Sequence, residues 1–526
     1  MGLTTLEQWK RWAVDYENLP FIRKYTEVPG IPASWEPFWN GTGKPSFVLE
    51  SGKSGRYTYF GADPAGVITG KGAQATIVEY EDTGSVWKGA VRSERQVTGS
   101  PLQIVKSWMH PYRSPVVEGV PPFAGGCVGY WSYDVARSIE RLPLCAEDDL
   151  LLPDYDFMMM RRVFAYDMQE RVLYCAVHRF VPFGERDAAW PERLDELYKE
   201  AEQETQRMAD WWKEAVNAAA SDKRSEQRAR AFDSISREEA LAVDVEAIPG
   251  IRIDFSKERY MEAVRQIQRY IAQGDVFQVN LSVRQNRELE REPEQIYEWL
   301  RLLNPSPYMG LLRFPDYTIV SGSPELLVKS VGGVVETRPI AGTRPRGSDE
   351  QEDQRLAEEL LSNEKERAEH IMLVDLLRND LGRVSRYGTV KVTDLMVVER
   401  YSHVMHIVSH VQGKLAEDKD AFDLIAAAFP GGTITGAPKI RTMEIIEELE
   451  PVRRGPYTGS IGWIDYNGNM ELNIVIRTLV VRGGIGYVQS GAGIVIDSDP
   501  EKEFVESLNK AKALWKAILY SENARS

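Results

Sequence analysis

A long run of charged and small residues divides this 526-residue chain into two parts of different character. From residue 190 to about 244 the chain is rich in Ala, Glu, Lys, Arg and Gln, which predicts a helix and then a solvated, mobile connection. Before it lie short β-rich segments separated by turns, such as PSFVLES and RVLYCAVHRF, which predict a sheet with few helices. The sequence therefore predicts an N-terminal unit at 1–195, a charged helical or mobile connection at 196–250 and a second unit at 251–520.

Helical and strand patterns alternate in the second unit. A helix is predicted from Ser256, its N-cap, to Gly274 at its C-terminal end, and the alternating strand VFQVNLSVR follows. The segment DQRLAEELLSNEKERAEHIMLVDLLRNDLGR predicts one long helix or two adjoining ones. A hairpin is expected to turn at Asn467-Gly468, and a last helix to start at Pro500.

Composition excludes several classes of protein. Hydrophobic residues make up 43% of the chain, which is too many for a disordered protein. The formal charge of -15 disfavours binding to nucleic acid, although it does not exclude a small anionic substrate. No run approaches about 18 apolar residues, so no membrane span is predicted. Three cysteines at spacings that suit neither a zinc ribbon nor a disulfide framework favour a reducing compartment, and we expect a cytoplasmic protein.

Two acidic helix faces are candidates for a metal site. EKERAEH places Glu366 and Glu369 on one helical face, and EFVESLNK places Glu503, Glu506 and Lys510 on another. Two such faces opposite each other, with waters and a substrate carboxylate, provide the oxygen ligands that Mg²⁺ prefers. The alternative for each face alone is an ordinary solvated surface with ion pairs.

Three loops rich in small residues allow a ligand to approach the backbone. In FPGGTITGAPK, Ala437 and Pro438 stand where a nucleotide-binding P-loop needs Lys and Ser or Thr, so that function is excluded. The candidate residues of the three loops are Thr433, Thr343, Gly491, Ala492 and Gly493. Each loop alone is compatible with a generic turn. Together with Arg477 and the acidic faces they predict a pocket for a small ligand with several carboxylates and Mg²⁺, without naming the ligand.

These motifs, in this order, resemble the chorismate-utilising enzymes. The resemblance covers about 255–520 strongly, through GDVFQVNLS, SGSPELL, ETRPIAGTRPRG, NEKERAEHIMLVDLLRNDLGRV, FPGGTITGAPKIRTMEIIEELEP and QSGAGIVIDSDPEKEFVESLNKA, and the N-terminal part more loosely. It identifies 251–520 as the chorismate-binding catalytic unit. It implies a mixed α/β (α+β) fold of the anthranilate synthase type, in which two large antiparallel sheets pack face to face, flanked by helices.

The resemblance also implies a role for each candidate residue. Glu369 and Glu506 match Mg²⁺ ligands that hold the C1 carboxylate of chorismate, with Glu366 and Glu503 nearby. Glu325 matches the general acid near the departing C4 hydroxyl, a task that requires a raised pKa. The other matches are His406 near the ring and enolpyruvyl side chain, Tyr457, Arg477 and Lys510 at the substrate carboxylates, and Thr433 and Gly491 in the loops that close on the substrate.

Position 278 separates two reaction classes in this family. Members that add water have a Lys there as the base, whereas this chain has Gln278, which cannot deprotonate water. The expected reaction is therefore an amination, with ammonia supplied by a separate glutamine amidotransferase subunit. The alternative is that Gln278 is only structural.

The branch of the family is less clear from the motifs. Ala341 in PIAGT is typical of anthranilate synthases, whereas Asn280 in QVNLS, YTGSIGW and ELNIVIRT are typical of aminodeoxychorismate synthases. We expect Mg²⁺-dependent amination of chorismate to 4-amino-4-deoxychorismate, for 4-aminobenzoate and folate. The alternatives are anthranilate formation with loss of pyruvate, for tryptophan, and a catalytically inactive, amino-acid-binding regulatory protein. With Ala341, direct attack of ammonia at C4 and addition at C2 followed by displacement both remain open.

One N-terminal motif suggests a second pocket. LES at 49–51, together with NPSPYM, resembles the pocket in which anthranilate synthases bind tryptophan as a feedback inhibitor. Glu50 and Ser51 are the residues that this resemblance singles out. The alternative is a plain strand end.

Overall fold

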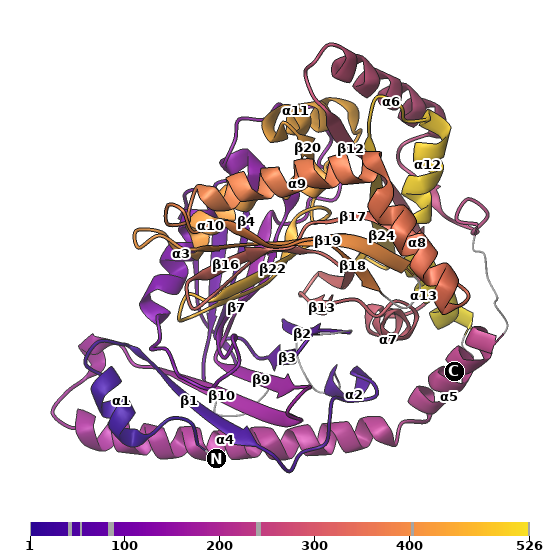
Figure 1. Ribbon diagram of the computed structural model, residues 1–526. Helices are drawn as coiled ribbons and strands as arrows, with labels where there is room; N and C mark the ends of the chain where they lie inside the picture. The colour runs from indigo at the N-terminus through magenta and orange to yellow at the C-terminus, as the bar shows by residue number, and fades with distance from the viewer. Residues whose placement is uncertain are drawn as a thin grey trace.

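The computed structural model describes residues 2–39, 45–52, 55–82, 89–237, 244–400 and 404–523. Within them, antiparallel strands form two sheets of twelve strands each (Figure 1). The first sheet contains, in spatial order, β1 (Asn18–Tyr25), β10 (Val172–Phe180), β9 (Arg162–Asp167), β3 (Tyr57–Ala62), β2 (Ser46–Glu50), β13 (Tyr308–Arg313), β14 (Tyr317–Ser323), β23 (Thr478–Arg482), β24 (Ile485–Ile494), β12 (Gln278–Glu288) and β11 (Arg252–Ile253), with β20 (Gly436–Ala437) beside β12.

The second sheet contains, in spatial order, β17 (Ile340–Pro345), β19 (Val404–Lys414), β16 (Val334–Thr337), β15 (Leu326–Val331), β22 (Met470–Ile474), β21 (Ser460–Asp465), β7 (Gly126–Trp131), β8 (Tyr155–Met160), β4 (Gly66–Lys71), β5 (Gln74–Tyr80) and β6 (Val91–Thr98), with β18 (Lys391–Arg400) beside β19. Both parts of the chain contribute to each sheet. β2 pairs with β13 in the first sheet, and β7 pairs with β21 in the second.

The helices surround these sheets. They are α1 (Leu6–Trp12), α2 (Glu36–Trp39), α3 (Pro101–Met109), α4 (Trp190–Ala220), α5 (Lys223–Arg237), α6 (Lys257–Ala272), α7 (Pro293–Leu303), α8 (Glu350–Ser362), α9 (Glu364–Gly382), α10 (Ala421–Ala428), α11 (Lys439–Leu449), α12 (Pro500–Asn509) and α13 (Lys512–Asn523). Short 3₁₀ turns occur at His110–Tyr112, Tyr133–Ser138, Phe183–Glu185 and Gly432–Ile434. None of the helices in the described ranges is long and apolar enough to cross a membrane.

One of the hydrophobic cores lies between the two sheets. Side chains from both sheets meet there, among them Phe47 and Ile319 from the first and Val128, Met158 and Ile461 from the second. Each strand alternates its side chains between two faces, so half of them point away from this core. These outer faces also carry apolar side chains, which the helices cover. The predicted fold class, two large antiparallel sheets packed face to face and flanked by helices, is confirmed.

The charged stretch begins with a helix that covers the first sheet. α4 runs along this sheet beside β1 and β10 (Figure 1) and buries Leu194, Met208 and Trp212 against it. Residues 238–243 of the predicted connection lie outside the described residues. The division of the chain at 195 and 250 stays a prediction.

Local signals in the second part identified the element ends correctly. The Ser256 hydroxyl accepts a hydrogen bond from the first turn of α6, and Gly274 has a positive φ of 83° after its end. The long helical segment is two helices, and Asn363 between them caps α9. β21 and β22 form the expected hairpin, in which Gly468 has a φ of 91°.

Candidate active site

Glu325 is a buried carboxyl between β14 and β15. Its side chain is 7% exposed, and its backbone carbonyl accepts a hydrogen bond from Ile474 N at 3.0 Å. Burial raises the pKa of this carboxyl from 4.5 to about 7, and the Thr433 hydroxyl and the Arg477 guanidinium oppose the rise. At neutral pH a large fraction of Glu325 is therefore protonated, so the side chain can donate a proton to a leaving oxygen.

Arg477 is the cation that faces Glu325. Its backbone has a left-handed φ of 50°, an uncommon conformation for a side-chain-bearing residue, immediately before β23. Burial lowers the pKa of the guanidinium, which the neighbouring Glu325 carboxyl opposes. Among the described residues no hydrogen bond or salt bridge satisfies this guanidinium. A partly desolvated arginine without such a partner, beside an acid that is only partly ionised at neutral pH, is suited to hold a carboxylate ligand.

His406 lies on β19 beside the same cluster. Its Nδ1 is 3.0 Å from the Gly342 carbonyl oxygen and 3.0 Å from the Thr343 hydroxyl. Because a carbonyl oxygen only accepts, Nδ1 carries the proton and Nε2 carries the lone pair. Burial lowers the pKa of His406, and the Arg477 charge lowers it further. The imidazole is therefore neutral and fixed in orientation.

The glycine-rich loop between α10 and α11 brings Thr433 to Glu325. Thr433 Oγ1 is buried and lies near the Glu325 carboxyl, whose pKa it lowers. Gly436 has a φ of 129°, and a Cβ there would lie 2.1 Å from the Gln278 carbonyl oxygen. The loop thus packs on β12 only because this position has no side chain. Pro438 is the N-cap residue of α11, which follows the loop.

The two acidic helix faces lie opposite each other. The pKa of Glu369 on α9 is raised by burial and also by the negative charges of Glu366, Glu503 and Glu506. Burial and the charge of Glu506 raise the pKa of Glu503 on α12. Within the ranges that the structure describes, no three acidic, histidine or cysteine side chains converge on a single point. Two converging faces of like charge nevertheless fit Mg²⁺, because this ion takes only one or two protein carboxylates and fills its shell with water and substrate.

Lys510 and the Gly-Ala-Gly segment of β24 lie beside this acidic pair. Lys510 Nζ is 3.0 Å from Glu506 Oε1 and donates to the Gly491 carbonyl oxygen at 2.9 Å. Side chains at the glycines would collide with β12, since a Cβ at Gly493 would lie 2.3 Å from Gln278 Nε2. Ala492 faces the opposite side, in the core that α6 and α12 share. The prediction of a loop at Gly491–Gly493 was wrong, because these residues belong to strand β24 and pair with β12. Gln278 lies against this strand.

Gly342 lies between the residues around Glu325 and the acidic helix faces. Its carbonyl oxygen accepts from His406, while a Cβ on it would lie 2.4 Å from Glu366 Oε2. Its φ of 64° and this close approach both require glycine. Glu366 in turn accepts a hydrogen bond from Arg344 at 2.8 Å. The structure thus connects the Glu325 cluster to the acidic helix faces through the PIAGT strand, β17.

Tyr457 lies in a buried network with Arg454 and Glu450, two residues that were not predicted to belong to the site. Burial raises the pKa of its phenol. The Arg454 guanidinium is 5.6 Å from the centre of its ring and pairs with Glu450. The spacing of Glu450 and Arg454, four residues apart, was visible in the sequence, but such pairs are common on solvated surfaces.

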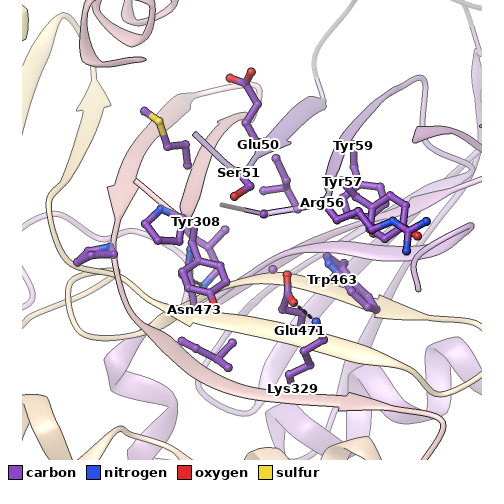
Figure 2. Close-up of a pocket in the computed structure, with 18 of the residues that line it drawn as sticks. Glu50, Ser51, Arg56, Tyr57, Tyr59, Tyr308, Lys329, Trp463, Glu471 and Asn473 are labelled. Atoms are coloured by element: carbon purple, nitrogen blue, oxygen red, sulfur yellow. Dashed lines mark hydrogen bonds and ion pairs between the residues drawn. The ribbon is translucent and has the colours of Figure 1, made fainter. Parts of the chain in front are cut away.

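Glu50 and Ser51 line a separate cavity of about 370 Å³ between the two sheets, together with Tyr308 and Met309 (Figure 2). The Glu50 carboxylate points away from the opposite wall. It accepts hydrogen bonds from Tyr297 Oη at 2.6 Å and from Arg301 Nη2 at 3.0 Å. Glu50 is thus engaged within the protein, and Ser51 is the predicted residue that remains at the cavity.

Comparisons with known proteins agree with this geometry. Residues 44–516 match the chorismate binding enzyme family. The chain is 47% identical to aminodeoxychorismate synthase component 1 of Bacillus subtilis (strain 168), over 90% of this chain and 92% of that protein. It is 41% identical to anthranilate synthase component 1 of Acetivibrio thermocellus, over 98% and 99%. The crystal structure of anthranilate synthase component I from Streptococcus pneumoniae TIGR4 superposes with a TM-score of 0.65 at 31% identity, over 88% of this chain and 92% of that one.

Proposed function

The chain belongs to the chorismate-binding enzyme family, and from this we propose that it aminates chorismate at C4 to give 4-amino-4-deoxychorismate, the precursor of 4-aminobenzoate and folate. The single observation that carries the chemistry is the Glu325 carboxyl with its pKa of about 7. The C4 hydroxyl is a poor leaving group until it is protonated. Glu325 donates this proton, the C4–O bond breaks, and the oxygen leaves as water.

The residues around Glu325 hold the dianionic substrate. The Arg477 guanidinium, which has no hydrogen-bonding partner among the described residues, pairs with a substrate carboxylate, and Tyr457 and Lys510 serve the same purpose. Thr433 offers a buried hydroxyl next to the Glu325 carboxyl. Its hydrogen bond to the bound substrate fixes the glycine-rich loop over the ring.

Glu369 and Glu506 are the side chains that would hold Mg²⁺, with Glu366 and Glu503 beside them. When bound there, the ion neutralises the C1 carboxylate of chorismate. The carboxylates' own mutual repulsion supports this assignment, because it raises the pKa of Glu369 in the metal-free arrangement. Lys510 then serves both groups, since it reaches Glu506 and the Gly491 carbonyl oxygen.

The nucleophile is ammonia rather than water. Gln278 lies against Gly493 and has no basic group with which to activate water. Ammonia needs no such base, and we propose that a separate glutamine amidotransferase subunit supplies it. His406, neutral and held through Nδ1 by the Gly342 carbonyl oxygen, orients the enolpyruvyl side chain, which is retained in the product.

Anthranilate formation is the second candidate. It is favoured by Ala341, which places a methyl group on β17 where many aminodeoxychorismate synthases have a lysine, and by the 41% identity to an anthranilate synthase. The higher identity of 47% to an aminodeoxychorismate synthase supports the first candidate. A catalytically inactive regulatory protein is disfavoured because Glu325, His406 and Arg477 remain together, and a site under no selection loses such residues.

Incubation of the purified protein with chorismate, Mg²⁺ and ammonium at alkaline pH distinguishes these functions. We expect a product that yields 4-aminobenzoate only after an aminodeoxychorismate lyase is added. Fluorescent anthranilate with released pyruvate would establish the second candidate instead. Absence of turnover, with chorismate binding unaffected by Glu369→Gln, would establish the third.

We further propose that the cavity at Ser51 binds tryptophan. Its volume of about 370 Å³ is within the usual range for small-molecule sites, and the Lys329–Glu471 pair on its wall, 2.9 Å apart, presents both charges to a zwitterion (Figure 2). Isothermal titration with tryptophan tests this proposal. Ser51→Ala is expected to weaken binding, and absence of heat with the wild-type protein would contradict it.

A further inference from the structure

Arg454 and Glu450 form a buried ion pair beneath the candidate site. Their side chains are 1% and 2% exposed. Arg454 Nε donates to Glu450 Oε2 at 2.9 Å, and Arg454 Nη2 donates to Oε1 at 2.7 Å, so the pair is bidentate. The guanidinium also lies over the rings of Tyr133 and Tyr457, at 5.0 and 5.6 Å from their centres. This geometry leaves the guanidinium a single orientation.

The remaining donors of Arg454 reach three other segments. Nη1 donates to the Ile434 carbonyl oxygen at 2.9 Å and to the Thr458 hydroxyl at 3.3 Å. Nη2 donates to the Asn280 carbonyl oxygen at 2.8 Å. All five N–H groups of the guanidinium therefore have an acceptor. Glu450 adds a further link, because it accepts from the amide and the hydroxyl of Ser282 at 2.9 and 2.8 Å.

Each of these segments carries a residue of the candidate site. Ile434 follows Thr433 in the glycine-rich loop, Asn280 and Ser282 follow Gln278 on β12, and Thr458 follows Tyr457. Backbone hydrogen bonds also join β12 to the glycine-rich loop, through the β12–β20 pairing and from Asn280 N to the Thr435 carbonyl oxygen at 2.8 Å. The Arg454 side chain adds contacts that link this loop and β12 to the segment at Thr458, three segments that are distant in sequence.

We propose that the Arg454–Glu450 pair is a positioning unit for chorismate, which holds Thr433, Gln278 and Tyr457 in one arrangement before the substrate binds. A simple structural role is disfavoured, because a buried ion pair adds little net stability compared with apolar residues of similar size. The inference rests on the proposed function, since it assigns these three residues to a common substrate.

Two variants separate positioning from folding. Arg454→Lys keeps the charge but has only three donors, so it cannot serve every acceptor at once. The double variant Arg454→Met with Glu450→Leu removes both buried charges together, although the Ile434 and Asn280 carbonyls then lose their donors. We expect kcat/KM for chorismate to fall about 100-fold in both variants, and a cooperative thermal transition to show that each is folded. A folded double variant with wild-type kcat/KM would overturn the proposal.

A matched control comes from another buried pair. Arg313 and Glu294 are 2.8 Å apart, 10% and 15% exposed, and Arg313 also lies over an aromatic ring, that of Trp39. Arg313→Met with Glu294→Leu is expected to leave kcat/KM unchanged. An equal loss in this control would show a general effect of removing buried charge and would also overturn the proposal.

Hydrogen exchange without substrate gives a readout that does not depend on turnover. We expect the amides of 431–437 and 454–458 to exchange faster in Arg454→Lys than in the wild type, and those of α4 to be unchanged. Equal exchange in these loops would contradict the positioning role. If the wild-type protein does not turn over chorismate, the proposed function fails, and the exchange data still decide whether the pair orders the loops.

Discussion

Two buried carboxyls in this protein have the same raised pKa but lie in different surroundings. Glu325 and Asp156 both have a pKa of about 7, and burial is the main cause in each case. Asp156 on β8 lies in the core between the sheets, where Tyr317 Oη from β14 donates to it at 2.8 Å. Glu325 instead faces a glycine-rich loop and Arg477, whose guanidinium has no hydrogen-bonding partner among the described residues. A raised pKa alone therefore does not identify a catalytic acid, whereas a neighbouring arginine that is suited to bind an anionic ligand is a second, independent sign.

The largest difference between Glu325 and Asp156 is expected when each carboxyl is replaced by its amide. Glu325→Gln keeps the shape of the side chain but removes the transferable proton, so we expect kcat to fall by about 10²- to 10⁴-fold. Asp156→Asn is expected to leave kcat unchanged. Steady-state kinetics with chorismate and ammonium measure both. An Asp156→Asn enzyme as impaired as Glu325→Gln would remove the distinction.

A second prediction concerns the acidic helix faces, where burial and the charges of neighbouring carboxylates raise the pKa of Glu369. Glu369→Gln is expected to increase the Mg²⁺ concentration needed for half-maximal activity about 10- to 100-fold, as loss of a metal-binding contact does. Chelation of Mg²⁺ is expected to abolish turnover in the wild type. Activity that persists in excess chelator would exclude the metal site.

A smaller effect is expected from Arg477, whose guanidinium has no hydrogen-bonding partner among the described residues. Arg477→Lys keeps a positive charge but loses the planar pair of donors, so we expect KM for chorismate to rise about tenfold or more. A matched change in the core, Arg313→Lys, is expected to leave KM unchanged because Arg313 already has Glu294 as a partner. Equal KM values for wild type and Arg477→Lys would show that the carboxylate is held elsewhere.

Asp156, the carboxyl between the two sheets, is expected to affect stability and not the rate of the reaction. Its pKa is about 7 in the folded protein and 3.8 in an ordinary environment, so the folded state binds more protons between these values. The free energy of unfolding therefore falls as pH rises from about 4 to 7, by up to about 4 kcal/mol from this group. Asp156→Asn is expected to flatten this dependence and to raise stability at pH 8. Urea denaturation at several pH values measures it, and an unchanged slope would contradict the assignment.

Much of the fold was predictable because its signals are local. The Ser256 cap, the Gly274 terminus and the hairpin turn at Gly468 depend on a few consecutive residues, and the structure has each of them. Gln278, Thr433 and Arg477 were identified by motif, and the resemblance to a family supplied their roles. The assembly of both sheets from the two parts of the chain came from the resemblance as well, not from periodicity.

The state of each charged group was not predictable, because it depends on contacts between distant residues. Glu50 was expected at a ligand, yet Tyr297 and Arg301, about 250 positions away, engage its carboxylate. Arg454 looked like any surface arginine until the fold placed the Ile434 and Asn280 carbonyls around it. Sequence shows which residues carry charge, while only the fold shows which charges lack a partner.

The most direct test is the dependence of kcat/KM on pH at constant free ammonia. A general acid is active when protonated, so the wild type is expected to lose activity as pH rises through about 7. Glu325→Gln is expected to show no such loss of kcat/KM near pH 7, and Asp156→Asn to show the same loss as the wild type. If the loss persists in Glu325→Gln, or shifts to another pH in Asp156→Asn, Glu325 is not the acid that protonates the leaving hydroxyl.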